Sequence, residues 1–427
     1  MLIGYSEVDI TPPVGVELCG YGYYPGRIST GISDPLFVRA ISFSKGEKRL
    51  LLLNCDLLTV SRKILDEVKQ NLKKDLGLRK EDILILSTHT HTGPNASDTE
   101  GIGERDENYC RALPALLIKA GHEAFKSMRQ VKQAKKLEAE LDGKVGYNRT
   151  SPKGPVDNRL RAAAFYFEEG KPLAILSYGC HPVTLGPSSE ISADYPGSVV
   201  KKMKKAGYNS LFLTAFCGDI DPVSNILRWG SGTGETIDQY GDIITGTFLK
   251  KIQEGMIAAD LSIESFEMDI KLDTVRLTGT DIDNFLKDSI GEKDRDPGKY
   301  KLMQLWTSRM KENIKSGRNP YERLLSVQAF KAGSILMAGF PAEMFTDLAR
   351  PLREAFPGMT VMALGNANAT VGYIATRNDI EAGGYAGFES SFLYMTLPLK
   401  AGEGERLAEE AAAGLRSKID CTAENNF

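Results

Sequence analysis

The sequence lacks any apolar run long enough to span a membrane, since a membrane helix needs about 20 such residues in succession. It also lacks a basic excess, because 53 Lys and Arg face 56 Asp and Glu and the formal net charge is −3. These two absences argue against a transmembrane segment and against nucleic acid as a partner. The N-terminus shows no basic segment followed by a long apolar one, so we expect no secretory signal and a cytoplasmic location.

Cysteine is sparse and histidine is rarer still. The six cysteines are widely scattered with no CxxC pair, which favours reduced, mostly buried thiols and again a cytoplasmic protein. Only four histidines occur among 427 residues. The content of 42% hydrophobic and 26% charged residues is ordinary for a soluble globular enzyme, and the length suffices for a large α/β core.

Two of the rare histidines follow a short apolar run at residues 83–86, which predicts a buried strand. His89 and His91 come next, and Gly93-Pro94 ends any regular structure. The apolar run at 172–178 is likewise followed by His181 and a proline. Open α/β sheets place their ligands outside the carboxyl ends of strands, so this repeated pattern indicates a site there.

Carboxylates occupy equivalent positions after two further predicted strands. The strand at 211–214 leads to Asp219 and Asp221, and the strand at 334–340 leads to Glu343. Convergence at one sheet edge would combine two imidazoles with a carboxylate, a donor set that suits Zn²⁺. A histidine at a strand end can instead cap its loop by hydrogen bonding. Because three of the four histidines occur in such turns, capping alone is a weaker explanation for the three together. The fourth, His122, lies in a predicted helix among charged residues and is expected at the surface.

Apolar spacing and capping residues predict an α/β fold with a mixed, largely buried central sheet, helices on both faces, and the metal site at the strand C-terminal edge. We expect a single domain over residues 1–427, with 262–330 as a possible subdomain excursion, and no C-terminal immunoglobulin-like domain. The helices are predicted at residues 62–76 (capped by Ser61 and Gly77), 107–128, 194–206, 236–256, 296–316, 343–356 and 402–418, with a loose tail at 419–427.

Six separate segments together resemble the catalytic domain of the neutral/alkaline non-lysosomal ceramidases. Their order and rough spacing agree with that family over almost the whole chain, and Asp9-Ile10-Thr11-Pro12-Pro13 fits its opening. The segments are Thr88-His89-Thr90-His91-Thr92-Gly93-Pro94, Asn148-Arg149-Thr150-Ser151-Pro152, His181-Pro182, Gly218-Asp219-Ile220-Asp221-Pro222, Pro341-Ala342-Glu343 and Gly372-Tyr373-Ile374-Ala375-Thr376.

The resemblance implies a zinc amidase that acts on an N-acyl bond, with one Zn²⁺ per chain and a small-molecule or lipid-like amide as substrate. By motif position it implies His91, Arg149 and Tyr385 as residues that contact the amide and hydroxyl oxygens of the substrate. It implies four zinc ligands: His89, His181, Glu343 and Tyr373.

Asp221 departs from the family, because ceramidases carry serine at this position. As a carboxylate beside a dication it could take the proton of a water, anchor a cationic or hydroxyl-bearing substrate, or merely form a turn before Pro222. Asp56 and Asp194 are candidates for accepting the second ring N–H of a zinc histidine, or else for capping. Asp219 is expected to shape its turn.

Three alternatives to a ceramidase-like amidase remain open at this point. The same zinc site could cleave a soluble ester, lactam or peptide bond. The chain could bind zinc without catalysis because of Asp221. It could also be a scaffold or interaction protein, although a scaffold gives no reason for histidines at strand ends. The length and polarity of the cleft above the metal would separate the substrate classes.

Overall fold

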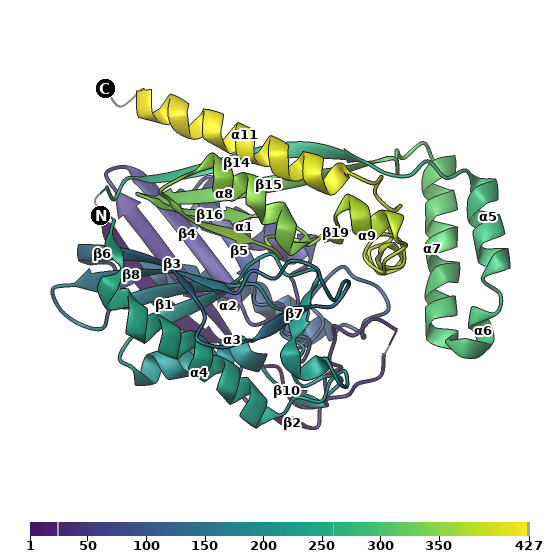
Figure 1. Cartoon of the computed structure of the whole chain (residues 1–427), viewed down its shortest axis with the longest axis horizontal. Coiled ribbons are helices and arrows are strands. Elements are labelled where there is room, and N and C mark those ends of the chain that lie inside the picture. The colour runs from purple at the N-terminus through teal and green to yellow at the C-terminus, as the bar shows by residue number, and fades with distance from the viewer. Residues whose placement is uncertain (24, 259, 425–427) are drawn as a thin grey trace.

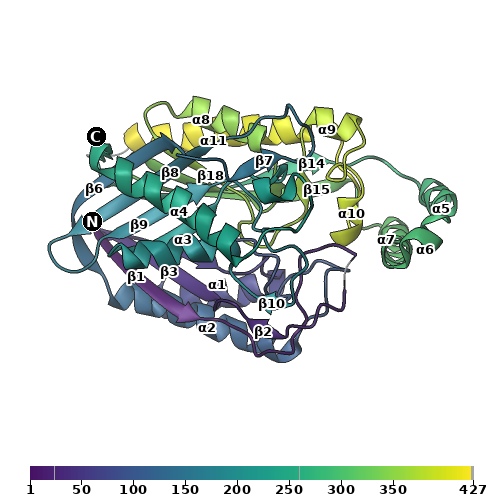
Figure 2. The same cartoon turned by 60° about the horizontal axis from the view of Figure 1, so that its bottom comes forward.

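The computed structural model describes residues 1–23, 25–258 and 260–424, and of residues 422–424 the backbone alone. Two β-sheets lie face to face at its centre, and helices cover their outer sides (Figure 1; Figure 2). The predicted mixed α/β class, with a buried central sheet flanked by helices, is confirmed. Among the described residues, no helix has both the length and the apolar character needed to cross a bilayer.

The larger sheet is mixed. Its strands β4 and β5 run parallel, as do β9 and β11, and the other pairs are antiparallel. Its order is β11(Asn209–Thr214), β9(Leu173–Tyr178), β8(Arg159–Phe167), β6(Arg129–Glu140), β1(Leu2–Asp9), β3(Phe37–Lys45), β4(Lys48–Cys55) and β5(Ile83–Ser87), with β13(Met256–Ile257) beside β6.

This sheet curls so that its two ends meet. The Asn54 side-chain amide donates to the carbonyl oxygen of Phe212 at 2.9 Å, and Thr214 Oγ1 donates to that of Thr88 at 2.8 Å. These bonds join β11, the first strand in this order, to β4 and to the end of β5, which are the last two. The loop after β5 therefore lies close to the loops that follow β9 and β11.

The second sheet packs against the first, and a shared apolar core lies between them. It contains β14(Ile263–Asp273), β15(Glu322–Ala332), β16(Ile335–Gly339) and β18(Thr360–Leu364) in that order. Much of the segment 262–330, expected as an excursion, thus builds this sheet. The part that projects from the body in both views is the helical group α5(Gly279–Asp288), α6(Glu292–Arg295) and α7(Pro297–Lys315).

Three apolar layers hold the helices to the sheets. Helices α1(Arg62–Leu76) and α2(Glu107–Lys126) pack on one half of the larger sheet, and α3(Asp194–Lys205) and α4(Gly234–Lys251) on the other half. Helices α8(Arg350–Ala355) and α11(Glu403–Glu424) cover the second sheet. Short helices α9(Arg377–Glu381) and α10(Ser390–Leu393) and three two-stranded pairs complete the fold: β2(Gly31–Ile32) with β10(Glu190–Ile191), β7(Gly146–Asn148) with β12(Ile220–Pro222), and β17(Glu343–Met344) with β19(Tyr373–Ile374).

Two predicted helices are wrong in part. The predicted helix 343–356 begins as strand β17, continues as a 3-10 turn at Thr346–Ala349, and is α-helical only in α8. Pairing of β17 with β19 holds Glu343 in extended backbone, so the helix starts late, with a proline in its first turn. The last helix is longer than predicted and runs into the expected tail, as far as Glu424.

Candidate metal centre

The segment after β5 holds two histidines in a fixed and unusual conformation. The backbone of His89 has φ of +70°, a left-handed value that a non-glycine residue adopts only when its surroundings impose it. Its N–H donates to the carbonyl oxygen of Leu57 at 2.9 Å, which ties the segment to the loop after β4. Gly20, at φ of +120°, lies so close that a Cβ there would come within 2.8 Å of the His91 Cα.

The imidazole rings of His89 and His181 are both oriented by backbone carbonyls. His89 Nδ1 lies 2.8 Å from the carbonyl oxygen of Leu58, and His181 Nδ1 lies 3.2 Å from that of Ile220. An Nδ1–H that donates to a carbonyl leaves the lone pair on Nε2, the form in which histidine binds a metal. Both rings are buried.

The two free Nε2 atoms face one carboxylate oxygen. Glu343 Oε2 lies 3.2 Å from His89 Nε2 and 3.0 Å from His181 Nε2. Burial acts to raise the pKa of Glu343, but the neighbouring His89 and His181 outweigh it and hold the pKa well below its usual range. A carboxylate and two imidazoles thus converge from two different sheets, as the strand ends predict.

These distances and donors fit a metal ion better than a set of hydrogen bonds. If each Nε2 donated a proton to Glu343 while each Nδ1 donated to a carbonyl, both buried histidines would be cations beside one carboxylate. A single dication satisfies all three atoms with neutral imidazoles. Ligand bonds of about 2.0–2.1 Å in a tetrahedron place neighbouring ligand atoms ~3.3 Å apart, close to the spacing here.

Tyr373 lies next to Glu343 because β19 and β17 pair in parallel with these two residues as direct partners. The Tyr373 hydroxyl is 3.5 Å from His181 Nε2, and the two rings are nearly parallel. Burial, followed by the charge of Glu343, raises the pKa of Tyr373 well above its ordinary value. The four side chains for which the resemblance implies a zinc site are therefore brought together, and their role as ligands stays a prediction.

Arg149 and Asp221 form an ion pair at the edge of this cluster. Arg149 Nη1 donates to Asp221 Oδ1 at 3.2 Å, and Nη2 donates to the Tyr373 hydroxyl at 3.0 Å and to the Gly218 carbonyl at 2.8 Å. Pairing of β7 with β12 brings the two chain segments together. Gly218 lets this segment lie against Glu343, because a Cβ at position 218 would lie 2.7 Å from the carbonyl oxygen of Glu343.

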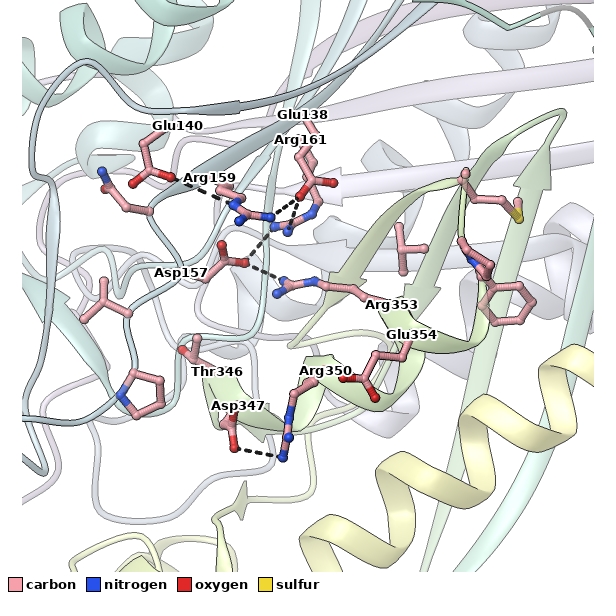
Figure 3. Close-up of a pocket in the computed structure, with 18 residues that line it drawn as sticks. Glu138, Glu140, Asp157, Arg159, Arg161, Thr346, Asp347, Arg350, Arg353 and Glu354 are labelled. Carbon is pink, nitrogen blue, oxygen red and sulfur yellow. Dashed lines mark hydrogen bonds and ion pairs between the residues drawn. The ribbon is translucent and has the colours of Figure 1, made fainter.

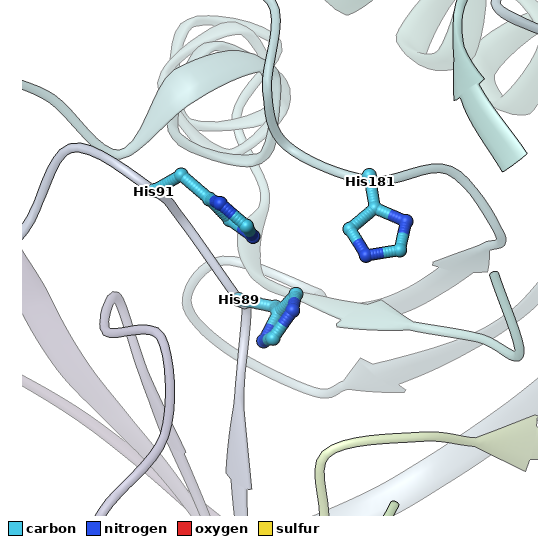
Figure 4. Close-up of side chains that lie close together, drawn as sticks. All are labelled: His89, His91 and His181. Carbon is cyan, nitrogen blue, oxygen red and sulfur yellow. The ribbon is translucent and has the colours of Figure 1, made fainter. Parts of the chain in front are cut away.

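His91 completes a group of three imidazoles (Figure 4). The metal-binding atoms of His89, His91 and His181 all lie within 4.8 Å of one another, so these three residues could also hold a metal ion. Neither ring nitrogen of His91 has a hydrogen-bond partner among the described residues, although both are buried. Burial, reinforced by His89 and His181, holds the pKa of His91 well below its ordinary value, so the ring is neutral and can donate one hydrogen bond and accept another.

Two further tyrosines surround the cluster. Tyr385, which the resemblance implies, contacts Tyr373 edge to face with ring centroids 5.7 Å apart and remains partly exposed. Tyr394 was not predicted, and its hydroxyl donates to Glu343 Oε1, the oxygen that the histidines do not face. This bond fixes the carboxylate from behind, and no motif in the sequence marks Tyr394.

Of the two roles considered for Asp56 and Asp194, acceptance from a zinc histidine is wrong, and both carboxylates instead accept from backbone amides. Asp56 binds Arg39 at 2.7 Å and accepts from the Phe37 amide. Asp194 accepts from the amide and hydroxyl of Thr184 and from the amide of Tyr195. Backbone carbonyls take their place behind the histidines.

Asp219 and His122 behave as expected. Asp219 joins three segments by accepting from the Asn148 side chain and from the Thr346 amide, which shapes its turn. His122 is partly exposed on α2 and lies 3.1 Å from the carboxylate of Asp75.

Two large cavities lie away from the histidines. One, of about 590 Å³, is lined by arginines and carboxylates between β8 and α8 (Figure 3). Its charges are paired internally, since Arg161 and Arg353 both bind Asp157 at 2.7 Å. The other, of about 620 Å³, lies between β3 and α3. The imidazole cluster, with its convergent donors, is therefore the better candidate for chemistry.

Comparison with known proteins identifies chains of similar sequence and fold. Residues 1–102 match the family described as neutral/alkaline non-lysosomal ceramidase, N-terminal. The fold is similar to that of neutral ceramidase from Pseudomonas aeruginosa, with a TM-score of 0.73 and 19% identity over 98% of this chain and 74% of that one. It is equally similar to a ceramidase complexed with C2, with a TM-score of 0.73 and 18% identity over 98% of this chain and 75% of that one.

Proposed function

We propose that this chain, a member of the neutral ceramidase family, is a zinc-dependent hydrolase that cleaves the amide bond of a small-molecule or lipid-like N-acyl substrate. One observation carries the proposal: two buried imidazoles, each oriented by a carbonyl, turn their free nitrogens to one carboxylate oxygen at 3.2 and 3.0 Å. We assign one zinc ion per chain to His89, His181, Glu343 and Tyr373.

The other site residues suit amide hydrolysis. A bound zinc ion would lower the pKa of a water from 15.7 to about 7 and polarise the substrate carbonyl. Arg149, fixed by Asp221, and neutral His91 would donate hydrogen bonds to the oxygen on which negative charge develops. Tyr385, the partly exposed member, would contact a substrate hydroxyl. Asp221 then acts by holding Arg149, in place of the roles as proton acceptor or substrate anchor considered above.

Replacement of the ligand histidines tests the proposal. We expect His89→Ala and His181→Ala to lose the zinc and all hydrolysis of a panel of N-acyl amides and esters, because each removes one of few ligands. Zinc is measured by elemental analysis of the purified variants. The control is His122→Ala, which changes the remaining histidine at the surface of α2 and should retain about one zinc per chain. Full zinc occupancy in both ligand variants would refute the assignment.

His91→Ala separates the two possible ligand sets. If Glu343 and Tyr373 complete the site, this variant keeps its zinc and loses turnover. If the three histidines hold the metal, it loses zinc as His89→Ala does. The panel also decides among the substrate classes. Turnover of soluble esters or peptides alone would favour a non-lipid hydrolase. Zinc binding with no turnover of any substrate would favour a zinc-binding protein without catalysis.

A further inference from the structure

The loop between β12 and α4 exposes three large apolar side chains within four residues. Leu227 is 97% exposed, Ile226 57% and Trp229 45%. Single exposed apolar residues are normal on soluble proteins, whereas a group of this size marks a surface that binds another apolar phase. We call residues 226–229 the apolar loop.

The apolar loop is held in a defined conformation beneath its exposed tip. The buried side chain of Asn225 accepts from the amide of Gly230 at 3.1 Å, and Ser231 Oγ donates to the carbonyl oxygen of Ser224 at 2.8 Å. Gly230 packs directly on Gly186, where a Cβ at position 230 would lie 2.8 Å from the Gly186 Cα. The turn is thus preformed, and it directs the apolar side chains outward instead of into the core.

The apolar loop borders the imidazole cluster. The ring of Trp229 contacts that of Tyr21 edge to face at 4.9 Å, and the Tyr21 ring lies 5.1 Å from that of His91. Helix α4, which follows the loop, begins beside β10 at the end of the molecule that carries the site loops (Figure 2). One aromatic side chain therefore separates the exposed loop from the proposed site.

The charge of the loop fits a phospholipid surface. Arg228 is the only charged residue from Val223 to Thr233, and it is exposed between Leu227 and Trp229. A guanidinium binds phosphate by paired hydrogen bonds, and tryptophan favours the boundary between headgroups and acyl chains. We propose that the apolar loop inserts into the headgroup layer of a phospholipid surface and brings the imidazole cluster to it. Insertion itself does not depend on the proposed function. Only its purpose, the capture of a lipid-borne amide substrate, rests on that function.

Tryptophan fluorescence tests the insertion without any turnover. The chain has two tryptophans, and Trp306 is fully buried with its indole N–H bonded to the Thr396 carbonyl, so an emission change reports Trp229. Phosphatidylcholine vesicles should shift the emission to shorter wavelength, and brominated acyl chains should quench it. Leu227→Ser should weaken vesicle binding about tenfold or more, because a fully exposed leucine gains most from burial.

The control is Ile257→Ser, which removes another exposed apolar side chain (62%) from β13, a strand that pairs with β6. It should bind vesicles like the unaltered protein in co-sedimentation. Absence of vesicle binding, or equal loss in both variants, would overturn the proposal. So would a Trp229 shift that appears without vesicles as protein concentration rises, since a second copy would then cover the loop. Vesicle binding without hydrolysis would refute the proposed function alone.

Discussion

At the scale of single residues, Arg149 is the most constrained side chain beside the imidazole cluster. Its guanidinium binds three acceptors from two segments: the carboxylate of Asp221 and the carbonyl of Gly218 in one, and the hydroxyl of Tyr373 in the other. A serine in place of Asp221, as in ceramidases, could not form an ion pair with it. The aspartate therefore fixes the arginine in this chain and leaves less freedom where a substrate oxygen would bind.

Asp221→Asn tests this role. The change keeps the shape and removes the charge, so Arg149 loses its ionic partner but the histidines keep their carbonyls. A hydrogen bond to a charged group contributes roughly 1.5–3 kcal/mol, which corresponds to a fall of about 10-fold to 100-fold in kcat/KM. Zinc content should not change. Asp142→Asn, which alters an exposed aspartate paired with Lys250, is the control. Loss of zinc from Asp221→Asn would show instead that Asp221 helps to hold the metal.

Several residues of the site could be predicted because short motifs mark them. His89, His91, His181 and Glu343 each follow a buried strand, so their neighbourhood follows from the topology of the sheets. Tyr394 could not be found in this way, since it lies 51 residues after Glu343 in an irregular segment and acts through one hydroxyl. The partners of the histidine Nδ1 atoms are backbone carbonyls, which carry no signal in the sequence at all.

At the scale of elements, helix α1 was predicted with both of its ends because local rules set them. The side chain of Ser61 accepts from the amide of Ile64, and Gly77 ends the helix at φ of +67°. Strand β17 was missed for the opposite reason. It is held by its partner β19, thirty residues later, and a two-residue strand has no periodicity. Its pairing register is nevertheless what places Glu343 beside Tyr373.

The buried face of α1 contains a lysine that should make stability depend on pH. Burial lowers the pKa of Lys69 from 10.5 to about 7, and its ammonium donates to the side-chain oxygen of Gln328 at 3.1 Å. Between pH 7 and 10.5 the unfolded chain binds a proton that the folded chain lacks, so stability should rise with pH in this window. Below pH 7 Lys69 is protonated in the folded state as well, so the folded state bears the full free-energy cost of burying its charge.

Lys69→Met should therefore stabilise the protein most below pH 7 and little near pH 10.5. The gain is on the order of 1.4 kcal/mol for each unit of pKa shift that is removed, and Gln328 keeps a donor in Asn368. Thermal unfolding at several pH values measures it. Lys63→Met, at an exposed position of the same helix, should show no such trend. Equal effects of the two substitutions on thermal stability at every pH would contradict the lowered pKa of Lys69.

At the scale of the whole molecule, the site joins two sheets that pack through one core. His89 and His181 follow strands of the larger sheet, whereas Glu343 follows β16 of the second sheet and is paired with Tyr373. The sequence could not predict this division, because β14 pairs with β15 across a long helical insertion, and β15 in turn pairs with β16. A metal at this place would link the sheets, so the proposed zinc should contribute to global stability.

Removal of the metal tests that link. A ligand that binds only the folded state stabilises it by about 4.1 kcal/mol at a free concentration 1,000 times its Kd. We therefore expect a chelator such as dipicolinate to lower the Tm of the unaltered protein, and added zinc to restore it. His89→Ala should start at the lower Tm and respond to neither treatment, whereas His122→Ala should respond fully. An unchanged Tm after verified removal of zinc would mean that the two sheets hold together without the metal, and that the ligand atoms are already fixed by their carbonyl and tyrosine partners.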